Sequence, residues 1–374
     1  MVKPLAKQRL QSVRDRMQAR QLDALIVYSQ RRGHIPYLSG YRPNYHTNSA
    51  FLVLPLEGEP AMLIKFGFDM PRARSQSWID DIRPGHSEDA CFLFREFAGI
   101  LEEKGLRGAR LGWVAADDTI DEMSAGLWEC MRRELPAARL EPASDLVNRL
   151  RLSKDPGEVE LLRRATEIIE CSAQALGRAL APGVEDCAAA AQAATAGLSA
   201  GASRCDVILS PRAAELTLPP KHDRFRQGDA VSLELTVEYE GYWVQICRTF
   251  SLGPASPLQK RVFAACRDAY QAAVDLARPG ARAADLARAA ISVVDQAGFP
   301  GSIRYGLGHG VGLDLPEPCG IDPHSTAVLE DHMALVIHVS AWVEGAAAFV
   351  GGPIIVESGG PLVLDHPQRE IMEV

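Results

Sequence analysis

The feature that most constrains the fold is a pair of similar segments in the C-terminal half of the chain. Residues 171–194 and 266–290 each combine a helix-forming stretch, a Pro-Gly break and an alanine-rich second helix. β-forming segments follow each copy. Because two copies are too few for a solenoid, the repeat predicts a pseudo-twofold unit in which two helix pairs cover one face of a curved antiparallel sheet. A ligand site would then lie on the open face of that sheet.

The N-terminal part shows a different alternation. Residues 22–29 form an apolar, β-rich run, and residues 50–56 and 61–66 flank a Glu-Gly-Glu-Pro turn as the strands of a hairpin do. Two further helices and the strand between them are expected at 92–104, 119–134 and 109–115. Strands that alternate with helices in this way predict an α/β domain.

A polar string at residues 149–157 separates the two parts. Within it, Asp155 and Pro156 suit the N-cap and first turn of a long helix. A chain of 374 residues is too long for one ordinary core. We therefore predict two domains, residues 1–152 and 153–374, of overall class α/β (α+β).

Composition excludes several classes of function. The net charge of -8 argues against a general nucleic-acid surface or an acidic membrane surface, since both partners need clustered Lys and Arg. The charged N-terminal segment does not resemble a signal peptide, and no apolar run approaches the roughly 20 residues of a membrane helix. The eight cysteines form no CxxC pair and suit reduced thiols. These features predict a cytoplasmic protein that acts on a small molecule.

Two motifs resemble one known family. Residues 228–253 and the run 308–318, which begins Gly-His-Gly-Val-Gly, resemble the creatinase, prolidase, aminopeptidase P and methionine aminopeptidase family, whose fold is called pita-bread. In the N-terminal half, residues 22–29, 37–41 and 57–60 agree in order and spacing. The resemblance implies a creatinase-like N-terminal domain followed by a pita-bread domain, although fold alone does not fix function.

The resemblance also locates a former metal site. In metal-dependent members, two divalent ions are held by two Asp, one His and two Glu. By position, these five ligands correspond here to Glu234, Gln245, His309, His338 and Gly351. Two more family histidines that handle substrate correspond to Thr217 and Pro316.

Charge arithmetic makes a two-metal site improbable. Four carboxylates offset the four positive charges in the family site, whereas Glu234 alone would leave about three charges uncompensated. We therefore expect no metal and no other cofactor. The alternative is a single ion held by Glu234, His309 and His338, because two imidazoles and a carboxylate are a known mononuclear set.

Each candidate residue has a plainer structural alternative. His309 lies between glycines, where a backbone approaches something closely, but it could be a buried histidine with a satisfied ring. His338 interrupts an apolar strand and could be hydrogen-bonded core. Cys247 could be a nucleophile beside an imidazole or a buried filler. Arg248-Thr249-Phe250 is expected to brace the sheet.

The resemblance to creatinase, the metal-free hydrolase of this fold, implies further contacts. There the neighbouring subunit's N-terminal domain reaches over the pocket, which here implies a homodimer with Tyr45, His46 and Asn48 as contacts. Arg304 lies near the position that grips a substrate carboxylate, with a surface salt bridge as the alternative. The base histidine of creatinase corresponds to Thr217.

We therefore predict a metal-independent, creatinase-like enzyme that breaks a C–N bond, by hydrolysis or elimination, in a small carboxylate-bearing nitrogen compound. His309 or His338 would move protons, Glu234 would orient an imidazole and raise its pKa, and Gln245 with Thr217 would hydrogen-bond substrate. One alternative is a pseudoenzyme that serves as a binding module. The other is the mononuclear metalloenzyme.

Overall fold

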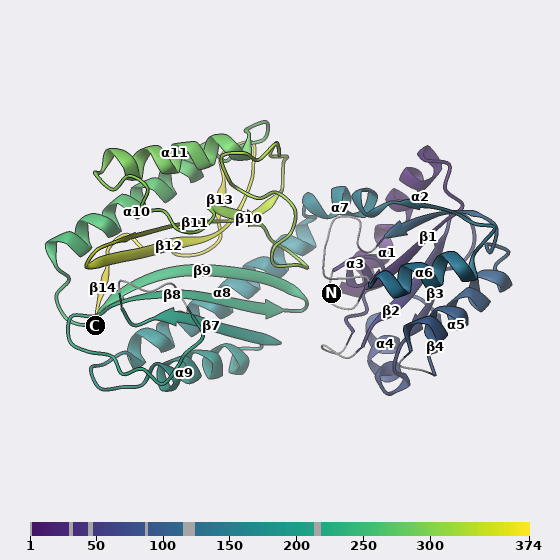
Figure 1. Cartoon of the computed structure of the whole chain (residues 1–374), viewed down its shortest axis with the longest axis horizontal. Helices are drawn as coiled ribbons and strands as arrows, with labels where there is room; N and C mark the ends of the chain where they lie inside the picture. Colours follow the sequence, from purple (N-terminus) through teal and green to yellow (C-terminus); the bar gives the residue numbers. More distant parts are fainter. Residues whose placement is uncertain (1, 30–32, 44–47, 87–88, 115–123, 213–217) are drawn as a thin grey trace. The chain divides into compact units, whose positions relative to one another are not determined.

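The computed structural model describes residues 2–29, 33–43, 48–86, 89–114, 124–212 and 218–374. The chain divides into two compact units, Met1–Arg151 and Leu152–Val374, so the division falls one residue before the expected boundary. Both units combine helices with a sheet, which confirms the α/β class (Figure 1). Among the described helices, none has the length and apolar character needed to cross a membrane.

The first unit is built on a six-stranded mixed sheet in the order β4-β3-β2-β1-β5-β6. Its strands are β1 (Ala24–Ser29), β2 (Ala50–Pro55), β3 (Ala61–Ile64), β4 (Asp81–Pro84), β5 (Arg110–Val114) and β6 (Arg139–Pro142). Its helices are α1 (Val2–Gln8), α2 (Leu10–Ala19), α3 (His34–Ser39), the 3-10 turn η2 (Gly67–Asp69), α4 (Met70–Gln76), α5 (Ala90–Glu103), α6 (Ala125–Glu134) and α7 (Ser144–Leu152).

The expected hairpin of this unit is confirmed. Strands β2 and β3 pair antiparallel, from Ala50 opposite Ile64 to Val53 opposite Ala61, across the Glu-Gly-Glu-Pro turn. Helix α6 begins later than expected, because the side chain of Ser124 accepts a hydrogen bond from the Leu127 amide and caps the helix there. The first residues of the expected helix lie outside the described residues.

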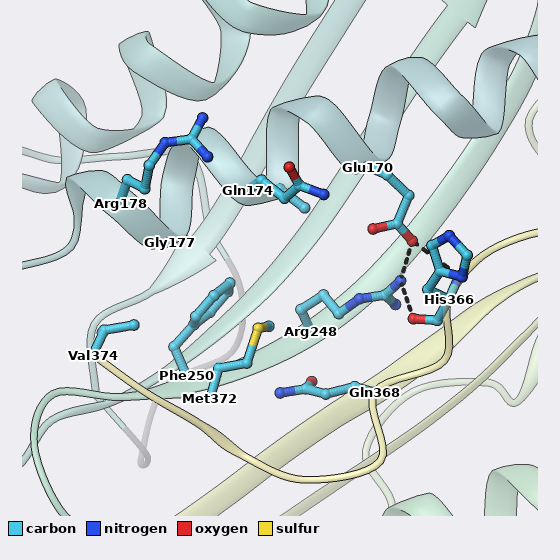
Figure 2. Close-up of a pocket in the computed structure, with 11 residues that line it drawn as sticks. Glu170, Gln174, Gly177, Arg178, Arg248, Phe250, His366, Gln368, Met372 and Val374 are labelled. Carbon is cyan, nitrogen blue, oxygen red and sulfur yellow. Dashed lines mark hydrogen bonds and ion pairs between the residues drawn. The ribbon is translucent and has the colours of Figure 1, made fainter.

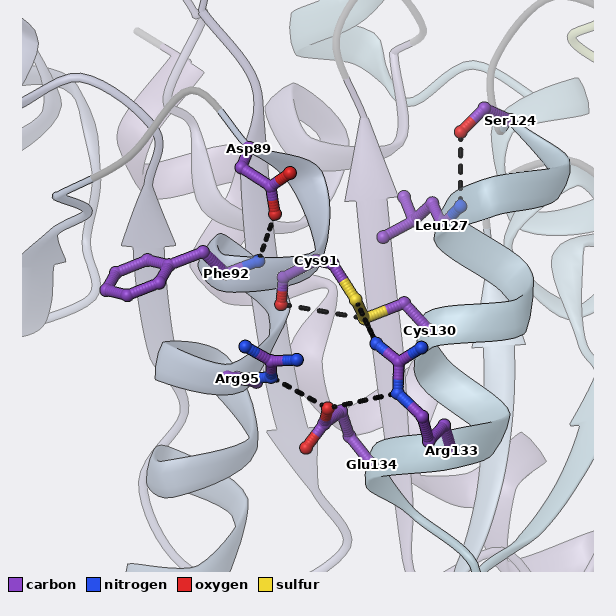
Figure 3. Close-up of a disulfide and its surroundings, with 9 residues drawn as sticks. All are labelled: Asp89, Cys91, Phe92, Arg95, Ser124, Leu127, Cys130, Arg133 and Glu134. Atoms are coloured by element: carbon purple, nitrogen blue, oxygen red, sulfur yellow. Dashed lines mark hydrogen bonds and ion pairs between the residues drawn. A yellow bond between two sulfur atoms is a disulfide. The ribbon is translucent and has the colours of Figure 1, made fainter.

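The expectation that all cysteines are reduced is wrong for one pair. Cys91 and Cys130 form a disulfide that joins α5 to α6, with 5.5 Å between their Cα atoms (Figure 3). Both helices pack on the same part of the unit's hydrophobic core, which brings the two side chains face to face. Sequence spacing could not reveal this contact. The other six cysteines are free thiols.

The second unit is built on an eight-stranded sheet. Its main order is β10-β11-β12-β9-β8-β7, with β13 beside β12 and β14 beside β9. The strands are β7 (Arg204–Ser210), β8 (Ala230–Tyr239), β9 (Tyr242–Ser251), β10 (Gly308–Gly310), β11 (Ala334–Val343), β12 (Ala346–Ile355), β13 (Leu362–Val363) and β14 (Met372–Glu373). The helices are α8 (Pro156–Ala179), α9 (Asp186–Ser199), α10 (Pro257–Leu276) and α11 (Ala283–Gln296).

The predicted repeat is confirmed as two helix pairs on one sheet. Helices α8 and α9 back strands β7 to β9, and α10 and α11 back β11 and β12 (Figure 1). The Pro-Gly breaks turn each pair, and Gly183 and Gly280 adopt φ values of 87° and 88°, which favour glycine. Helix α8 begins with a capping box between Asp155 and Glu158, as the N-cap prediction required.

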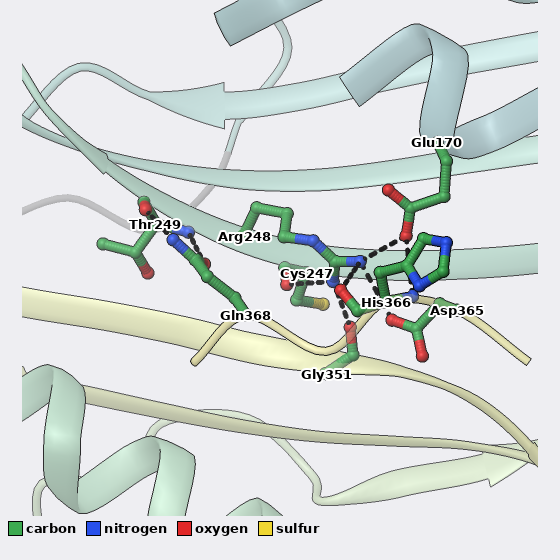
Figure 4. A network of polar contacts seen from close by, with 8 residues as sticks. All are labelled: Glu170, Cys247, Arg248, Thr249, Gly351, Asp365, His366 and Gln368. Carbon is green, nitrogen blue, oxygen red and sulfur yellow. Dashed lines mark hydrogen bonds and ion pairs between the residues drawn. The ribbon is translucent and has the colours of Figure 1, made fainter. Parts of the chain in front are cut away.

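The two halves of the sheet meet where β9 crosses β12. Gly351 opposite Cys247 is the one register pair between these strands, both of which are described in full. Arg248 reinforces this seam, because its Nη1 donates to the carbonyls of Gly351 and Cys247, both at 3.0 Å (Figure 4). Its Nη2 donates to Asp365 at 2.9 Å and to Glu170 at 2.7 Å.

Thr249 completes the seam on the opposite face of β9. Its hydroxyl donates to the carbonyl of Phe349 at 3.0 Å and accepts from the amide of Phe349 at 2.8 Å. The Thr249 amide in turn donates to the Gln368 side chain at 2.9 Å. The expectation that Arg248 and Thr249 brace the sheet is therefore confirmed.

Replacing Arg248 by Met should destabilise the second unit. Asp365 is fully buried, and loss of the guanidinium would leave its carboxylate without a compensating charge, at a cost of about 3–5 kcal/mol. The measurement is urea unfolding followed by circular dichroism. Arg224→Met is the matched control, because Arg224 and Glu185 form an exposed pair worth at most about 1 kcal/mol. Equal losses for both variants would contradict the role of Arg248.

Candidate active site

A row of four residues crosses the seam on the face that the helices leave open. Glu234 of β8 lies opposite Cys247 of β9, Cys247 opposite Gly351 of β12, and Gly351 opposite His338 of β11. Residues directly opposite one another in a sheet point to the same face. The neighbours Ile337 and Val339 point the other way, into the core under α10 and α11. The row therefore joins both halves of the repeat.

His309 adds a second imidazole beside this row. It lies in β10 opposite Val336, two residues before His338 on the same face of β11. The two imidazole rings have centroids 6.0 Å apart and planes inclined by 67°. The two histidines, which come from separate segments, therefore lie side by side on one face of the sheet, as expected.

Hydrogen bonds fix the tautomer of His309. Its Nδ1 lies 2.9 Å from the Gly310 carbonyl, which can only accept, so Nδ1 carries the proton. In the neutral ring Nε2 then carries the lone pair. The Oε1 of Gln245 lies 3.0 Å from Nε2, so the neutral ring, whose Nε2 lone pair needs a donor, requires the Gln245 amide in the flipped orientation. With Oε1 toward the ring, the same amide accepts a hydrogen bond from Nε2 of the protonated imidazole.

Both imidazoles favour the neutral form. Burial lowers the pKa of His309, and the hydrogen bond to Gly310 only partly opposes this effect. Burial, together with the nearby His309, lowers the pKa of His338 to about 3. Glu234 lies farther along the row and instead raises, after burial, the pKa of the Cys247 thiol. The expectation that Glu234 raises an imidazole pKa is therefore wrong, and Cys247 is a protonated filler.

Gly351 brings β12 unusually close to His338. A Cβ added to Gly351 would lie 2.4 Å from the Ile337 carbonyl oxygen and 2.5 Å from Cβ of His338. No side chain fits there without movement of the backbone. The position therefore excludes a carboxylate ligand by geometry as well as by sequence.

Aromatic residues that sequence reasoning missed surround His338. Phe349 lies edge-on to its ring at 5.4 Å, Tyr305 stacks on Phe349 at 5.5 Å, and Trp342 packs against Tyr305 at 5.3 Å. The period-2 alternation of β11 and β12 would have placed Trp342 and Phe349 on the same face as His338 and Gly351. These rings form an apolar wall on one side of the candidate site.

A buried ion pair organises the segment after His309. Lys154 Nζ lies 2.6 Å from the Glu317 carboxylate, and the two side chains are 1% and 2% exposed. Glu317 also accepts from the Leu313 amide at 3.0 Å. A Cβ on Gly312 would lie 2.7 Å from the same carboxylate, so only glycine allows this approach. The pair fixes the loop that leaves His309, and Lys154 was not expected to take part.

The remaining predicted contacts are distributed differently. Arg304 is exposed and has no ion-pair partner within the described part of the chain. Asn48 is fully buried in the first unit, where its side chain bonds Tyr41, Asp69 and the Phe66 amide. The expectation that Asn48 contacts substrate is therefore wrong, since no surface of it is exposed. Tyr45, His46 and Thr217 lie outside the described residues.

The residues at the former ligand positions do not fit a metal centre. Among described residues, the only group of three metal-ligating side chains with mutually close ligand atoms is Cys91, Cys130 and Glu134. Glu234, His309 and His338 do not form such a group, and Gln245 engages the Nε2 of His309. This geometry argues against both the two-ion and the one-ion arrangement.

A separate cavity of about 470 Å³ lies on the helix-covered face (Figure 2). It is formed by α8, the end of β9 and the C-terminal segment, with Phe250 and Met372 among its apolar contacts. Arg248 and Phe250 alternate with Cys247 and Thr249 along β9, so this cavity and the histidines lie on opposite faces of the sheet.

His338 should make the second unit sensitive to acid. Its folded-state pKa of about 3 lies below the ordinary value of 6.5, so between these values the unfolded chain binds more protons. Stability is therefore full above pH 6.5 and falls as pH decreases toward 3, by up to about 1.4 kcal/mol per pH unit.

His338→Gln should flatten this dependence, as measured by urea unfolding at pH 4 to 7. His324→Gln serves as the control, because His324 is exposed and its replacement should leave the slope unchanged. An unchanged slope in His338→Gln would contradict a buried, neutral His338.

Comparison with known proteins agrees with this architecture. Residues 9–153 match the creatinase/prolidase N-terminal domain, and residues 160–358 match the metallopeptidase family M24. An ectoine hydrolase from Halomonas elongata is 26% identical over 96% of this chain and 95% of its own length. An Xaa-Pro dipeptidase from Lactobacillus helveticus is 27% identical over 86% and 87%.

Solved structures show the same fold. The prolidase from Pyrococcus horikoshii superposes with a TM-score of 0.85 at 21% identity, covering 98% of this chain and 100% of the prolidase. The two units, their order and the two-repeat sheet thus agree with the family models. The chain belongs to the metallopeptidase family M24 and carries the creatinase/prolidase N-terminal domain.

Proposed function

We propose that this protein breaks a C–N bond in a small, polar, carboxylate-bearing nitrogen compound without a metal ion. The observation that carries the proposal is the pair of neutral imidazoles, 6.0 Å apart, on the open face of the sheet. The named relatives include hydrolases of an Xaa-Pro dipeptide and of ectoine, so C–N hydrolysis is the reaction class of the neighbours.

His309 is the proton-transfer residue in this proposal. Its lone pair lies on Nε2, because Nδ1 donates to the Gly310 carbonyl. Nε2 would take a proton from the attacking water and return it to the leaving nitrogen. The Gln245 Oε1, which lies 3.0 Å from Nε2, would accept a hydrogen bond from the imidazolium and stabilise it while the proton resides there.

His338 would bind substrate rather than act as the base. A group whose pKa is near 3 accepts a proton only at high cost at neutral pH. Its Nδ1 and the hydroxyl of Ser340 are buried without a hydrogen-bond partner in the described structure. Buried polar atoms normally have partners, so a polar ligand at this position would satisfy both. Arg304 is the exposed cation available for a substrate carboxylate.

A second candidate function is a retired enzyme that serves as a binding module. The aromatic wall favours it, because Phe349, Tyr305 and Trp342 occupy the space beside His338. The unpaired Nδ1 of His338 favours the enzyme, since a merely filled site has no use for it.

In either case we propose a homodimer in which the neighbour's Tyr45 and His46 cover the site.

Replacing His309 by Ala should abolish turnover. The assay screens amides and amidines that carry a carboxylate, with EDTA present, and detects the released amine by mass spectrometry. Loss of a positioned base should reduce kcat by about 10²–10⁴.

His324→Ala is the matched control and should keep full activity. Near-normal turnover by His309→Ala would contradict the proposed base, and turnover that EDTA abolishes would contradict the metal-free mechanism. Binding of a panel compound without any turnover would favour the binding module instead.

A further inference from the structure

A second chemical centre lies in the first unit, at the Cys91–Cys130 disulfide. We propose that this pair is a site of reversible thiol–disulfide exchange, with Cys91 as the reacting sulfur and small disulfides such as oxidised glutathione as the co-reactant. The proposal does not depend on the function assigned to the histidines. Three features of the surroundings carry it.

The first feature is the place of Cys91 in its helix. Cys91 is the second residue of α5, whose N-cap residue Asp89 accepts a hydrogen bond from the Phe92 amide (Figure 3). The first-turn amides of a helix have no partner within the helix and stabilise a nearby negative charge. A thiolate at Cys91 would lie in this favourable position.

The second feature is Arg133, which lies against the sulfurs. Its Nη2 is 2.6 Å from Sγ of Cys91 and 3.6 Å from Sγ of Cys130. A disulfide is neutral and only a weak acceptor, so the guanidinium gains little from it. The thiolate released on reduction would instead form a direct ion pair with Arg133, which favours a reactive Cys91.

The orientation of Arg133 is itself supported. Its Nε lies 3.5 Å from the Glu134 carboxylate, which also accepts from Arg95 at 2.8 Å. Arg95 thereby balances the charge of Glu134, and Arg133 remains available to the sulfur.

The third feature is the unequal exposure of the two cysteines. Cys91 is half-buried, whereas Cys130 is 1% exposed in the core beneath α6. A small disulfide can therefore reach Cys91 first. Cys130 is placed to act second, from the protected side, as a resolving thiol does.

The exchange takes place in two steps. The Cys91 thiolate attacks one sulfur of the small disulfide and expels a thiolate, which leaves a mixed disulfide on Cys91. Cys130 loses its proton and attacks Sγ of Cys91, and the second small thiolate departs. Two protein thiols and one small disulfide thus yield the Cys91–Cys130 bond and two small thiols.

A metal site is the rival explanation of the same cluster. Cys91, Cys130 and Glu134 offer three ligand atoms within 4.8 Å of one another. Arg133 argues against it, because a guanidinium in contact with a sulfur occupies the space of a cation and repels it. The experiment must therefore distinguish an exchangeable disulfide from a bound ion.

The test uses the full chain, reduced and freed of metal, in buffers of defined reduced-to-oxidised glutathione ratio. Differential alkylation and mass spectrometry should show Cys91 and Cys130 oxidising together, in one reversible two-electron step, while the buried thiol of Cys266 stays reduced. Cys130→Ser should accumulate the glutathione adduct on Cys91. Arg133→Gln should slow alkylation of reduced Cys91 by iodoacetamide at pH 7 about tenfold.

Arg132→Gln is the matched control, since Arg132 is an exposed arginine on the same helix and should leave the rate unchanged. Three results would overturn the proposal. They are equal rates in the two arginine variants, thiols that stay reduced at every glutathione ratio, and one tightly bound zinc ion per chain that Cys91→Ser removes.

Discussion

The seam between β9 and β12 is the constraint on which the rest of the second unit depends. Each half of the repeat brings its own helix pair and strands, yet one register pair, Gly351 with Cys247, joins the halves. Arg248 and Thr249 lie on opposite faces of β9, and each donates a side-chain hydrogen bond to the backbone of β12, which holds the two halves together. Because Glu234 lies in one half and His338 in the other, this seam brings the site together.

The electrostatics of the open face explain why the site differs from a metal centre. Burial disfavours the charged form of both imidazoles, and the glycine at position 351 leaves no room for a carboxylate to offset an ion. The same burial favours the neutral form of His309, whose Nδ1 donates to the Gly310 carbonyl.

Much of this architecture could be predicted from sequence, and the failures have physical reasons. The Pro-Gly breaks at 182–183 and 279–280 act locally, through a glycine with positive φ, so the helix pairs were predictable. The Gly-His-Gly-Val-Gly motif likewise made it possible to predict His309 as a residue of the candidate site. The contacts of Cys91 with Cys130 and of Lys154 with Glu317 were not predictable, because they arise only through packing and no sequence motif marks them. The expected effect of Glu234 on an imidazole pKa was wrong, because corresponding positions in a family show which residues share a site but not the distances between them.

The most direct test of the account is ¹⁵N NMR of the imidazole nitrogens in protein labelled at its nine histidines. At pH 7 both His309 and His338 should be neutral, the proton of His309 should be on Nδ1, and excess Zn²⁺ or chelator should leave both spectra unchanged. Assignments follow from His309→Ala and His338→Gln. A charged imidazole at either position, or a metal-induced shift of the Nε2 resonance of His309 at one equivalent of Zn²⁺, would contradict it.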